Sequence, residues 1–506
     1  GVPQSSMLTR TVIQVAPRAP TFGIRSSSNL PLTMDSINKA VVSAQYAVRG
    51  ELILRAGKLK EELAADPSSK PFDKMVECNI GNPQALRQQP LSFNREVLAM
   101  MVMPSMLNKP EVVASFAPDA VARAKEYLAA IPSGVGAYSE SQGFGLVREQ
   151  VAAFISARDG VPAHKDSIFL TDGASKGVGF LLQTILRGST DGVLVPIPQY
   201  PLYSATLALA EAQMLGYELV ESSGWGMPIS ELEDTLKAAF ANGVTPRALV
   251  VINPGNPTGN TLSRDNMEAV VRFCSAHHLV LMADEVYQEN IYDDALPFIS
   301  FKKVLKEMVD APPLQLVSFH STSKGFLGEC GLRGGYFELE GFDDEVKGQI
   351  LKLLSIGLCS NTLGQIATGL MVAPPKPGDA SHAAFVSERD GIIASLKRRA
   401  TRLVRALNEL EGVTCNQPQG AMYAFPSITL PPKAIAAAEA AGKVPDTFYA
   451  LALLEATGIV VVPGSGFGQK EATWHFRTTF LPPEEEMEAV VARMGHFHAG
   501  FMEQYT

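Results

Sequence analysis

The sequence predicts an α/β fold in which a mostly parallel sheet of the seven-stranded type lies between helices, followed by a smaller α+β domain. Short apolar runs alternate with longer helical patterns through the middle of the chain. Such runs, four to eight residues long, are typical of strands buried on both faces of a parallel sheet. A chain of 506 residues exceeds one ordinary domain. The proline-rich stretch at 374–378 breaks the pattern and marks a boundary or a long loop.

The first 34 residues form a separate tail. They contain Arg10, Arg18 and Arg25 and several serines, and no acidic residue precedes Asp35. This composition resembles an organellar transit peptide, and a disordered tail fits it equally well. We therefore expect a mitochondrial protein, with a cytoplasmic or plastid location as the alternatives.

Three further segments follow the tail. Residues 35–109 are interpreted as an N-terminal arm and part of the small domain, with a helix favoured over 41–63. Residues 110–365 form the predicted large domain, with strands at 167–170, 192–196, 248–252, 279–283 and 316–319. Residues 366–506 complete the small domain, with a helix over 387–410, strands near 413 and 459, and a helix from 484.

Charge and cysteine content exclude several classes of function. The net charge of −9 disfavours binding to nucleic acid phosphates, which needs a basic surface. No apolar run reaches the roughly 20 residues of a membrane-spanning helix. The five cysteines are scattered and contain no C-x-x-C pair, so neither a disulfide framework nor a zinc site is predicted. A small-molecule enzyme fits this composition best.

Two polar segments follow predicted strands. In SFHSTSKG, at 318–325, Lys324 comes just beyond a buried strand, where it could become nucleophilic or remain a surface lysine. In ADEVY, at 283–287, Asp284 ends another strand, and such strand ends bind ligands in open α/β sheets. The alternative for Asp284 is a helix cap, and for Tyr287 a packed aromatic.

Three other segments indicate a rigid, anion-binding site. NPGNPTG at 253–259 contains two prolines and two glycines, so the loop is rigid and directs Asn256 to one place. DGASKG at 172–177 precedes a helical stretch, whose N-terminus with free N–H groups suits a phosphate. In GLRGG at 331–335, Arg333 could grip the same phosphate with two parallel hydrogen bonds. The alternatives are an ordinary turn, a helix cap and a surface arginine.

Along the chain the motifs appear in the order anion-binding turn, rigid Asn loop, Asp-x-x-Tyr and then Ser-x-x-Lys. In this order they resemble the fold type I aminotransferases, and within them the alanine aminotransferases. The resemblance runs from about residue 34 to the C-terminus. Its most specific stretches are 253–259, 283–288, 318–335, 419–426 and 461–478.

The resemblance implies pyridoxal 5'-phosphate as the cofactor and Lys324, Asp284 and Tyr287 as catalytic residues. Lys324 would form the internal aldimine and move the proton between the substrate Cα and the cofactor C4′. Asp284 would keep the pyridine nitrogen protonated, which makes the ring an electron sink. Asn256 and Tyr287 would hold the phenolic oxygen, and Tyr200 would stack on the ring.

The resemblance also assigns the phosphate and substrate contacts. Ala174, Ser175 and the Lys176 backbone would bind the phosphate together with Ser321 and Arg333.

On the substrate side, Arg477 would bind the α-carboxylate, with Asn256 and Gly81 beside the substrate; a structural salt bridge is the alternative for Arg477. Tyr138 would cross a homodimer interface to the partner's phosphate, unless it is a buried tyrosine.

The function expected from this resemblance is ping-pong transamination from L-alanine to 2-oxoglutarate, giving pyruvate and L-glutamate. A glutamate:glyoxylate aminotransferase would look nearly identical. A pyridoxal-phosphate-dependent lyase or synthase would use the same lysine but eliminate a leaving group. A cofactor-binding regulator is disfavoured because it needs a basic DNA-binding module.

Overall fold

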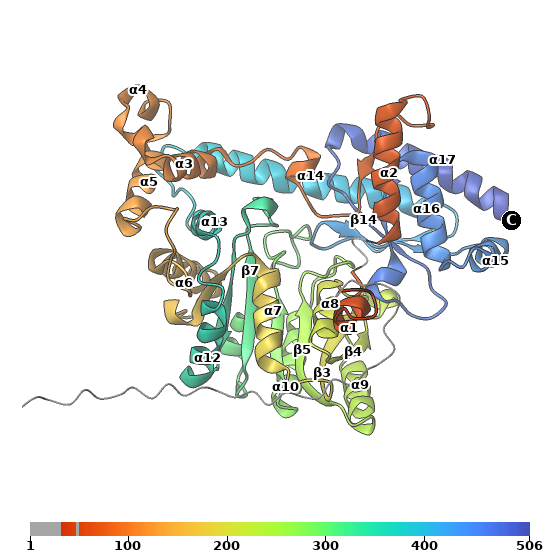
Figure 1. The fold of residues 1–506 in the computed structure, drawn as a ribbon, viewed down its shortest axis with the longest axis horizontal. Helices are drawn as coiled ribbons and strands as arrows, with labels where there is room; N and C mark the ends of the chain where they lie inside the picture. Colours follow the sequence, from red (N-terminus) through yellow and green to blue (C-terminus); the bar gives the residue numbers. More distant parts are fainter. Residues whose placement is uncertain (1–31, 47–49) are drawn as a thin grey trace, which may run out of the picture.

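The computed structural model describes residues 32–46 and 50–506. At its centre lies a seven-stranded sheet in the order β2-β8-β7-β6-β5-β3-β4 (Figure 1). The strands are β2 (Ile168–Thr171), β3 (Asp191–Ile197), β4 (Gln213–Glu218), β5 (Thr245–Ile252), β6 (Val280–Asp284), β7 (Leu316–Ser321) and β8 (Gly335–Glu340). All neighbours are parallel except β8, which runs antiparallel to β7 and β2. The mostly parallel sheet predicted from the sequence is confirmed.

Five of these strands coincide with the predicted apolar runs, and β4 and β8 do not. β4 is an edge strand whose residues are mostly exposed, so it lacks the continuous apolar pattern of a buried strand. β8 contains the charged residue Glu338, which is buried in the sheet. This burial is possible because the Glu338 carboxylate accepts a hydrogen bond from the buried Lys302 ammonium. Paired burial of this kind hides a strand from a search for apolar runs.

Helices cover both faces of the sheet. One face packs against α7 (Ala174–Ile185), α8 (Leu202–Leu209) and α12 (Asp344–Ser355). The other face packs against α9 (Ile229–Ala241), α10 (Arg264–Ala276) and α11 (Phe301–Glu307). The sheet is therefore buried on both sides, as its continuous apolar strands require.

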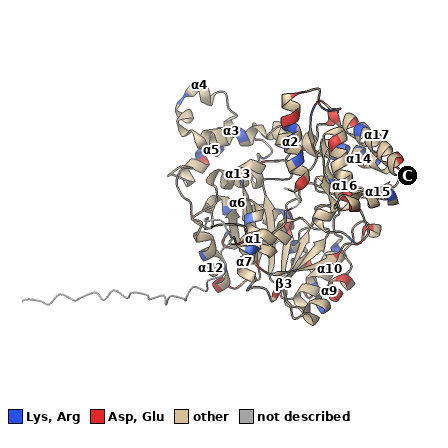
Figure 2. Ribbon diagram, turned by 45° about the vertical axis from the view of Figure 1, so that its right-hand side comes forward, with Lys and Arg blue, Asp and Glu red and all other residues tan. Residues whose placement is uncertain are grey.

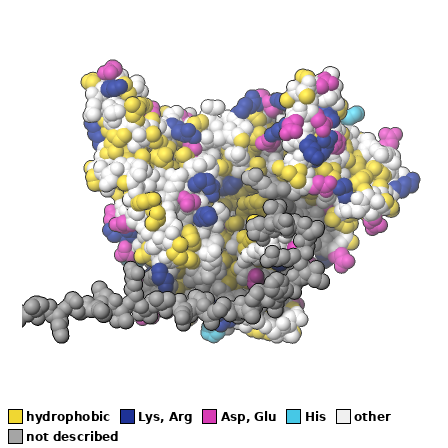
Figure 3. Space-filling model, in the orientation of Figure 1, with side chains coloured by type: hydrophobic (Ala, Val, Ile, Leu, Met, Phe, Trp, Pro, Cys, Tyr) yellow, Lys and Arg dark blue, Asp and Glu magenta, His cyan; other side chains and the backbone are white. Residues whose placement is uncertain are grey.

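A helical layer lies beside the β2 edge of the sheet. It consists of α3 (Ser92–Val102), α5 (Pro118–Ala130), α6 (Gly145–Asp159) and α13 (Thr362–Val372), which share one hydrophobic core. On the face seen in Figure 3, hydrophobic side chains gather over the upper left of the molecule, where this layer lies. Val102 and Met103 are 59% and 52% exposed at the end of α3.

The segment from α2 onward and the C-terminal part of the chain meet in another core, which we call the terminal core. It joins α2 (Glu51–Ala65), α14 (His382–Asn408), α16 (Pro445–Thr457) and α17 (Met487–Tyr505). Within it, β1 (Val76–Glu77) pairs in parallel with β12 (Ile459–Val460). Short antiparallel pairs join β10 (Tyr423–Ala424) and β13 (Val462–Pro463) to β14 (Phe476–Thr479). We propose that the terminal core forms the smaller domain, whose boundaries near 110 and 365 stay predictions.

The helix expected over 41–63 is wrong in its extent. The structure has two helices, α1 (Lys39–Ser43) and α2, with an extended backbone at Ala44 and the N-cap of α2 at Gly50. Glycine loses the most conformational freedom in a helix, so it favours a break. The transit-peptide prediction concerns residues that, up to residue 31, lie outside the described part.

Charged side chains lie mainly on the outer helices, as Figure 2 shows for α9, α10 and α14 to α17, while the sheet is largely free of them. All five cysteines are free thiols. Within residues 32–46 and 50–506, no helix is long and apolar enough to cross a membrane.

Candidate active site

A cavity of about 230 Å³ lies at the carboxyl ends of the parallel strands, facing the terminal core. Segments that follow β2, β3, β5, β6 and β7 all contribute to it, as expected of an open α/β sheet. The predicted site residues that line it are Gly81, Ala174, Ser175, Tyr200, Asn256, Asp284, Tyr287, Ser321, Lys324, Arg333 and Arg477. The fold thus brings together residues that are up to 396 positions apart (477 − 81).

Asp284 lies at the end of β6, on the floor of the cavity. Its Oδ2 accepts a hydrogen bond from the Tyr203 hydroxyl at 2.8 Å, and its buried Oδ1 has no partner within the described residues. Burial raises the pKa of Asp284 from 3.8 to about 6. The residues after it form a turn, so the helix-cap interpretation is wrong. A buried carboxylate oxygen without a donor needs a cationic or N–H ligand group above it.

Lys324 follows β7 and reaches across to the loop that carries Gly81. Its Nζ donates to the Gly81 carbonyl oxygen at 2.7 Å and lies 5.8 Å from the centre of the Tyr287 ring. A Cβ at Gly81 would lie 2.4 Å from the Tyr423 Oη and 2.9 Å from Nζ. A side chain here would therefore displace the Tyr423 hydroxyl and the Lys324 amine.

Arg333 closes the anion-binding end of the cavity. Its Nη2 donates to the Asp172 carbonyl at 2.9 Å and to Ser175 Oγ at 3.4 Å, beside the first turn of α7. A Cβ at Gly173 would lie 2.6 Å from Nη2, so the glycine permits this approach. Among the described residues, the guanidinium donates only to carbonyl and hydroxyl oxygens. A guanidinium, a hydroxyl and a helix N-terminus therefore converge, an arrangement that suits an anion.

Lys176 is exposed and does not line the cavity, and its backbone belongs to the first turn of α7. This agrees with the backbone contact that the resemblance implies. The contact itself stays a prediction.

Arg477 lies on β14 and is almost fully buried. Its guanidinium lies between the rings of Tyr423 and Phe467, 4.1 and 4.7 Å from their centres. Nη1 donates to Asn256 Oδ1 at 3.1 Å, Nη2 donates to the Asn79 carbonyl, and Nε has no partner. No described carboxylate pairs with it, so the structural salt bridge is wrong. A buried, unpaired cation favours an anionic ligand.

The loop that aims Asn256 at Arg477 is held by its own side chains. Thr258 Oγ1 donates to Asn260 Oδ1 at 2.6 Å, and the Gly255 N–H donates to the Asn260 carbonyl at 2.8 Å. A Cβ at Gly255 would lie 2.1 Å from Asn260 Oδ1, so glycine is required at this close approach. These hydrogen bonds tie the loop to itself, and its rigidity stays a prediction.

Several cavity residues were not expected from the sequence. Tyr423 lies in a stretch that carried the resemblance without a role, and its hydroxyl accepts a hydrogen bond from Tyr287 at 3.3 Å. Burial alone would raise its pKa, but the positive charges of Lys324 and Arg477 outweigh burial and lower the pKa of Tyr423. Tyr46 lines the cavity from the N-terminal segment, in a region expected only to be helical.

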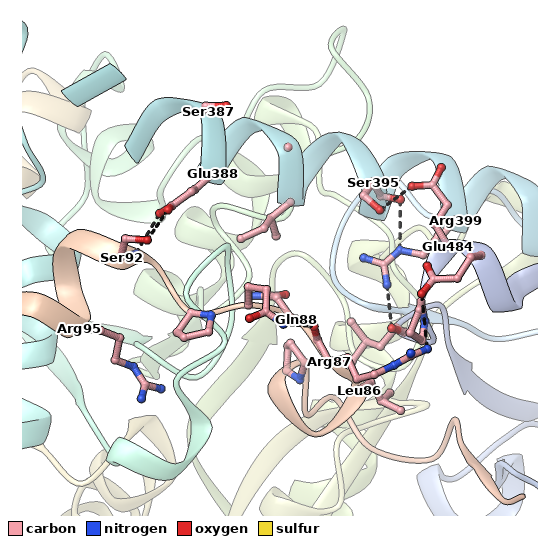
Figure 4. Close-up of a pocket in the computed structure, with 18 residues that line it drawn as sticks. Leu86, Arg87, Gln88, Ser92, Arg95, Ser387, Glu388, Ser395, Arg399 and Glu484 are labelled. Atoms are coloured by element: carbon pink, nitrogen blue, oxygen red, sulfur yellow. Dashed lines mark hydrogen bonds and ion pairs between the residues drawn. The ribbon is translucent and has the colours of Figure 1, made fainter. Parts of the chain in front are cut away.

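A second cavity of about 1050 Å³ lies between α14 and residues 83–95 (Figure 4). Its polar side chains are mostly occupied by one another: Ser92 donates to Glu388, and Arg399 donates to the Leu481 carbonyl at 2.7 Å. The drawn side chains are spread along the groove and do not converge on one point. The smaller cavity, where unpaired charges converge, is therefore the candidate active site.

Comparison with known proteins gives three findings. A family model described as aminotransferase class I and II matches residues 108–494. The chain is 54% identical to a probable mitochondrial alanine aminotransferase of Dictyostelium discoideum, covering 94% of this chain and 90% of the relative. It is 51% identical to glutamate–glyoxylate aminotransferase 2 of Arabidopsis thaliana, covering 94% and 97%. The structure of an alanine aminotransferase from Pyrococcus furiosus superposes with a TM-score of 0.73, covering 92% of this chain and 100% of that chain at 24% identity, which shows the fold alone.

Proposed function

Because the chain belongs to the class I and II aminotransferases and has the fold type I architecture, we propose that it transfers the amino group of L-alanine to 2-oxoglutarate, giving pyruvate and L-glutamate. The observation that carries this proposal is the buried Arg477 guanidinium, which has no carboxylate partner among the described residues. Its planar fork fits an α-carboxylate. The other described cations that line the cavity are Lys324 and Arg333, and we assign both to the cofactor.

The residues of the cavity fit pyridoxal 5'-phosphate, the cofactor of this family. The unpartnered Asp284 Oδ1 would face the pyridine nitrogen, Arg333 with Ser175 and Ser321 would hold the phosphate, and Lys324 would bind the aldehyde carbon. When bound, this cofactor accepts the substrate amino group and draws electrons from the substrate Cα.

The protein side chains position the substrate and move its proton. Arg477 binds the α-carboxylate and is itself held between two rings and by Asn256, so it is already oriented before substrate arrives. The Lys324 amine, free after substrate binding, takes the Cα proton as the general base. Asp284 holds a proton on the pyridine nitrogen throughout. Because the donor's product leaves before the acceptor enters the same cavity, the kinetics are ping-pong.

The test is to incubate the purified protein with L-alanine and 2-oxoglutarate and measure pyruvate, glutamate and ammonia. We expect pyruvate and glutamate in equal amounts without ammonia. Release of ammonia would instead indicate a lyase.

Glutamate with glyoxylate is the second candidate pair of substrates, favoured by the 51% identical relative. A higher kcat/KM for that pair than for alanine with 2-oxoglutarate would replace the first proposal.

A homodimer is also proposed. Tyr138 is 77% exposed and does not line the cavity of its own chain, so the buried-tyrosine interpretation is wrong. Ser141 Oγ donates to the Leu358 carbonyl at 2.6 Å, which places this loop beside a segment where Ile356 is 79% exposed. Exposed apolar side chains gathered in this way are typical of a protein interface. Tyr138 would contact the phosphate in the partner's site.

Mixing chains tests the shared site. A Tyr138→Phe chain and a Lys324→Ala chain, each weakly active or inactive alone, should together form heterodimers with one intact site. With random exchange, half of the dimers are mixed and half of their sites are intact, so about a quarter of wild-type activity should return. Either variant mixed with itself is the control. No recovery despite demonstrated chain exchange would contradict the proposed role of Tyr138.

We further propose a mitochondrial location. The support is the name of the Dictyostelium discoideum relative and the basic, serine-containing composition of residues 1–34.

A further inference from the structure

Two tyrosine hydroxyls meet at the wall of the active-site cavity. The Tyr46 and Tyr200 Oη atoms are 2.9 Å apart, and the ring centres are 6.4 Å apart with the rings at 65°. Tyr46 follows α1, which packs on α8, and Tyr200 lies between β3 and α8. Tyr46 is 37% exposed, so the pair borders both the cavity and solvent.

The hydroxyl pair retains hydrogen-bonding capacity. One hydroxyl donates to the other, which leaves the second proton free, and within the described residues neither oxygen has a further partner. Burial is the main cause that raises the pKa of Tyr200, and the neighbouring Tyr46 raises it further. The Tyr200 hydroxyl therefore stays protonated at neutral pH. When the two phenols give up their mutual hydrogen bond, both can donate to the two oxygens of one carboxylate.

The proposed reaction needs such a group. The same cavity must accept alanine, whose side chain is a methyl group, and 2-oxoglutarate, which carries a second carboxylate. The described cations of the cavity are Lys324, Arg333 and Arg477, and each already has a proposed ligand. A further buried cation would be left unpaired whenever alanine is bound, whereas a neutral hydroxyl is far less costly to desolvate.

The position of the pair also suits a second carboxylate. Arg477 and the hydroxyl pair line the same cavity of about 230 Å³. A five-carbon diacid held by Arg477 at one end could therefore meet the hydroxyl pair at the other.

We propose that the Tyr46 and Tyr200 hydroxyls bind the distal carboxylate of the five-carbon substrate, 2-oxoglutarate or L-glutamate, and that Tyr46 is a specificity-determining residue. The inference rests on the proposed function. Because Tyr46 contributes only a hydroxyl to this contact, its loss affects the diacid and spares the small substrates.

Tyr46→Phe tests the proposal on the cofactor-loaded enzyme. Calorimetry with two unreactive acids, glutarate and pentanoate, isolates binding of the second carboxylate. We expect the Kd of glutarate to rise about tenfold, since a hydrogen bond to a charged group is lost, while that of pentanoate stays within about twofold. In turnover, both five-carbon substrates should show a KM raised by the same factor, whereas the KM for alanine, the KM for pyruvate and the kcat stay unchanged.

Tyr505→Phe is the matched control, because it removes a phenol at the end of α17, far from the cavity along the chain and absent from its lining. An equal change for both acids, or no change for glutarate, would overturn the proposal and leave Tyr46 a packing residue. Lack of alanine turnover in the wild type would refute the proposed function instead, and the calorimetric comparison would still decide the role of the pair.

Discussion

Replacing Lys324 by alanine is expected to abolish both turnover and the covalent attachment of the cofactor. The Lys324 amine lies 2.7 Å from the Gly81 carbonyl at the centre of the cavity, and no other described lysine lines it. The proposed mechanism uses this amine twice, as nucleophile and as general base. Loss of a general base alone slows a reaction about 10²- to 10⁴-fold, so we expect at least about 10⁴ in kcat.

The attachment can be measured directly. Reduction of the wild-type protein with borohydride should leave the cofactor on the peptide that contains Lys324, seen by mass spectrometry, and the variant should show no labelled peptide. Lys237→Ala on the exposed face of α9 is the control, because its ammonium pairs only with Asp234 at the surface. A labelled, active Lys324→Ala protein would place the chemistry on another lysine.

Asp284→Asn should slow abstraction of the substrate Cα proton by about three orders of magnitude or more, because the charge that keeps the pyridine nitrogen protonated is gone while the shape is kept. The amino acid substrate should still bind, since Arg477, which is proposed to hold its α-carboxylate, is unchanged. Single-turnover absorbance with alanine measures the step. A cofactor analogue methylated at the ring nitrogen carries a fixed positive charge and should restore part of the rate. Near-normal turnover with the ordinary cofactor would refute this role of Asp284.

Asp284→Asn should slow the reaction but stabilise the cofactor-free protein at neutral pH. Burial raises the pKa of Asp284 from 3.8 to about 6, so the folded state binds the proton more tightly than the unfolded state. The cofactor-free wild type therefore loses stability as the pH rises from about 4 to about 6, on the order of 3 kcal/mol in the free energy of unfolding. Asparagine has no such loss. Urea unfolding at pH 7.5 should find the variant more stable, and at pH 3.5 the two should agree.

The part of the site that follows the sheet could be predicted from the sequence. Asp284, Lys324 and Asn256 each come directly after an apolar run, and parallel strands bring their carboxyl ends to one edge. Arg333 was found because glycines surround it. Local patterns sufficed because each of these positions is fixed by its own strand.

The other wall of the cavity depends on contacts between distant segments. Tyr423 reaches it because β10 pairs antiparallel with β14, with Tyr423 opposite Thr479, and no local pattern marks that register. Tyr46 reaches it because α1 ends at Ser43 and the backbone is extended at Ala44, and the Tyr46 hydroxyl then meets that of Tyr200. Periodicity could not reveal either, since both follow from tertiary packing.

The parallel pairing of β1 with β12 has a consequence for how the chain is made. Val76 pairs with Ile459, which is synthesised 383 residues later (459 − 76), so the two strands cannot pair before then. At the synthesis rates of about 5–20 residues per second, this delay is roughly 20–80 s. The central sheet, whose strands all lie between residues 168 and 340, can assemble on the ribosome in the meantime. The residues around Gly81 would then be among the first of the cavity to be synthesised and among the last to take their places, so a nascent chain exposes an unfinished site.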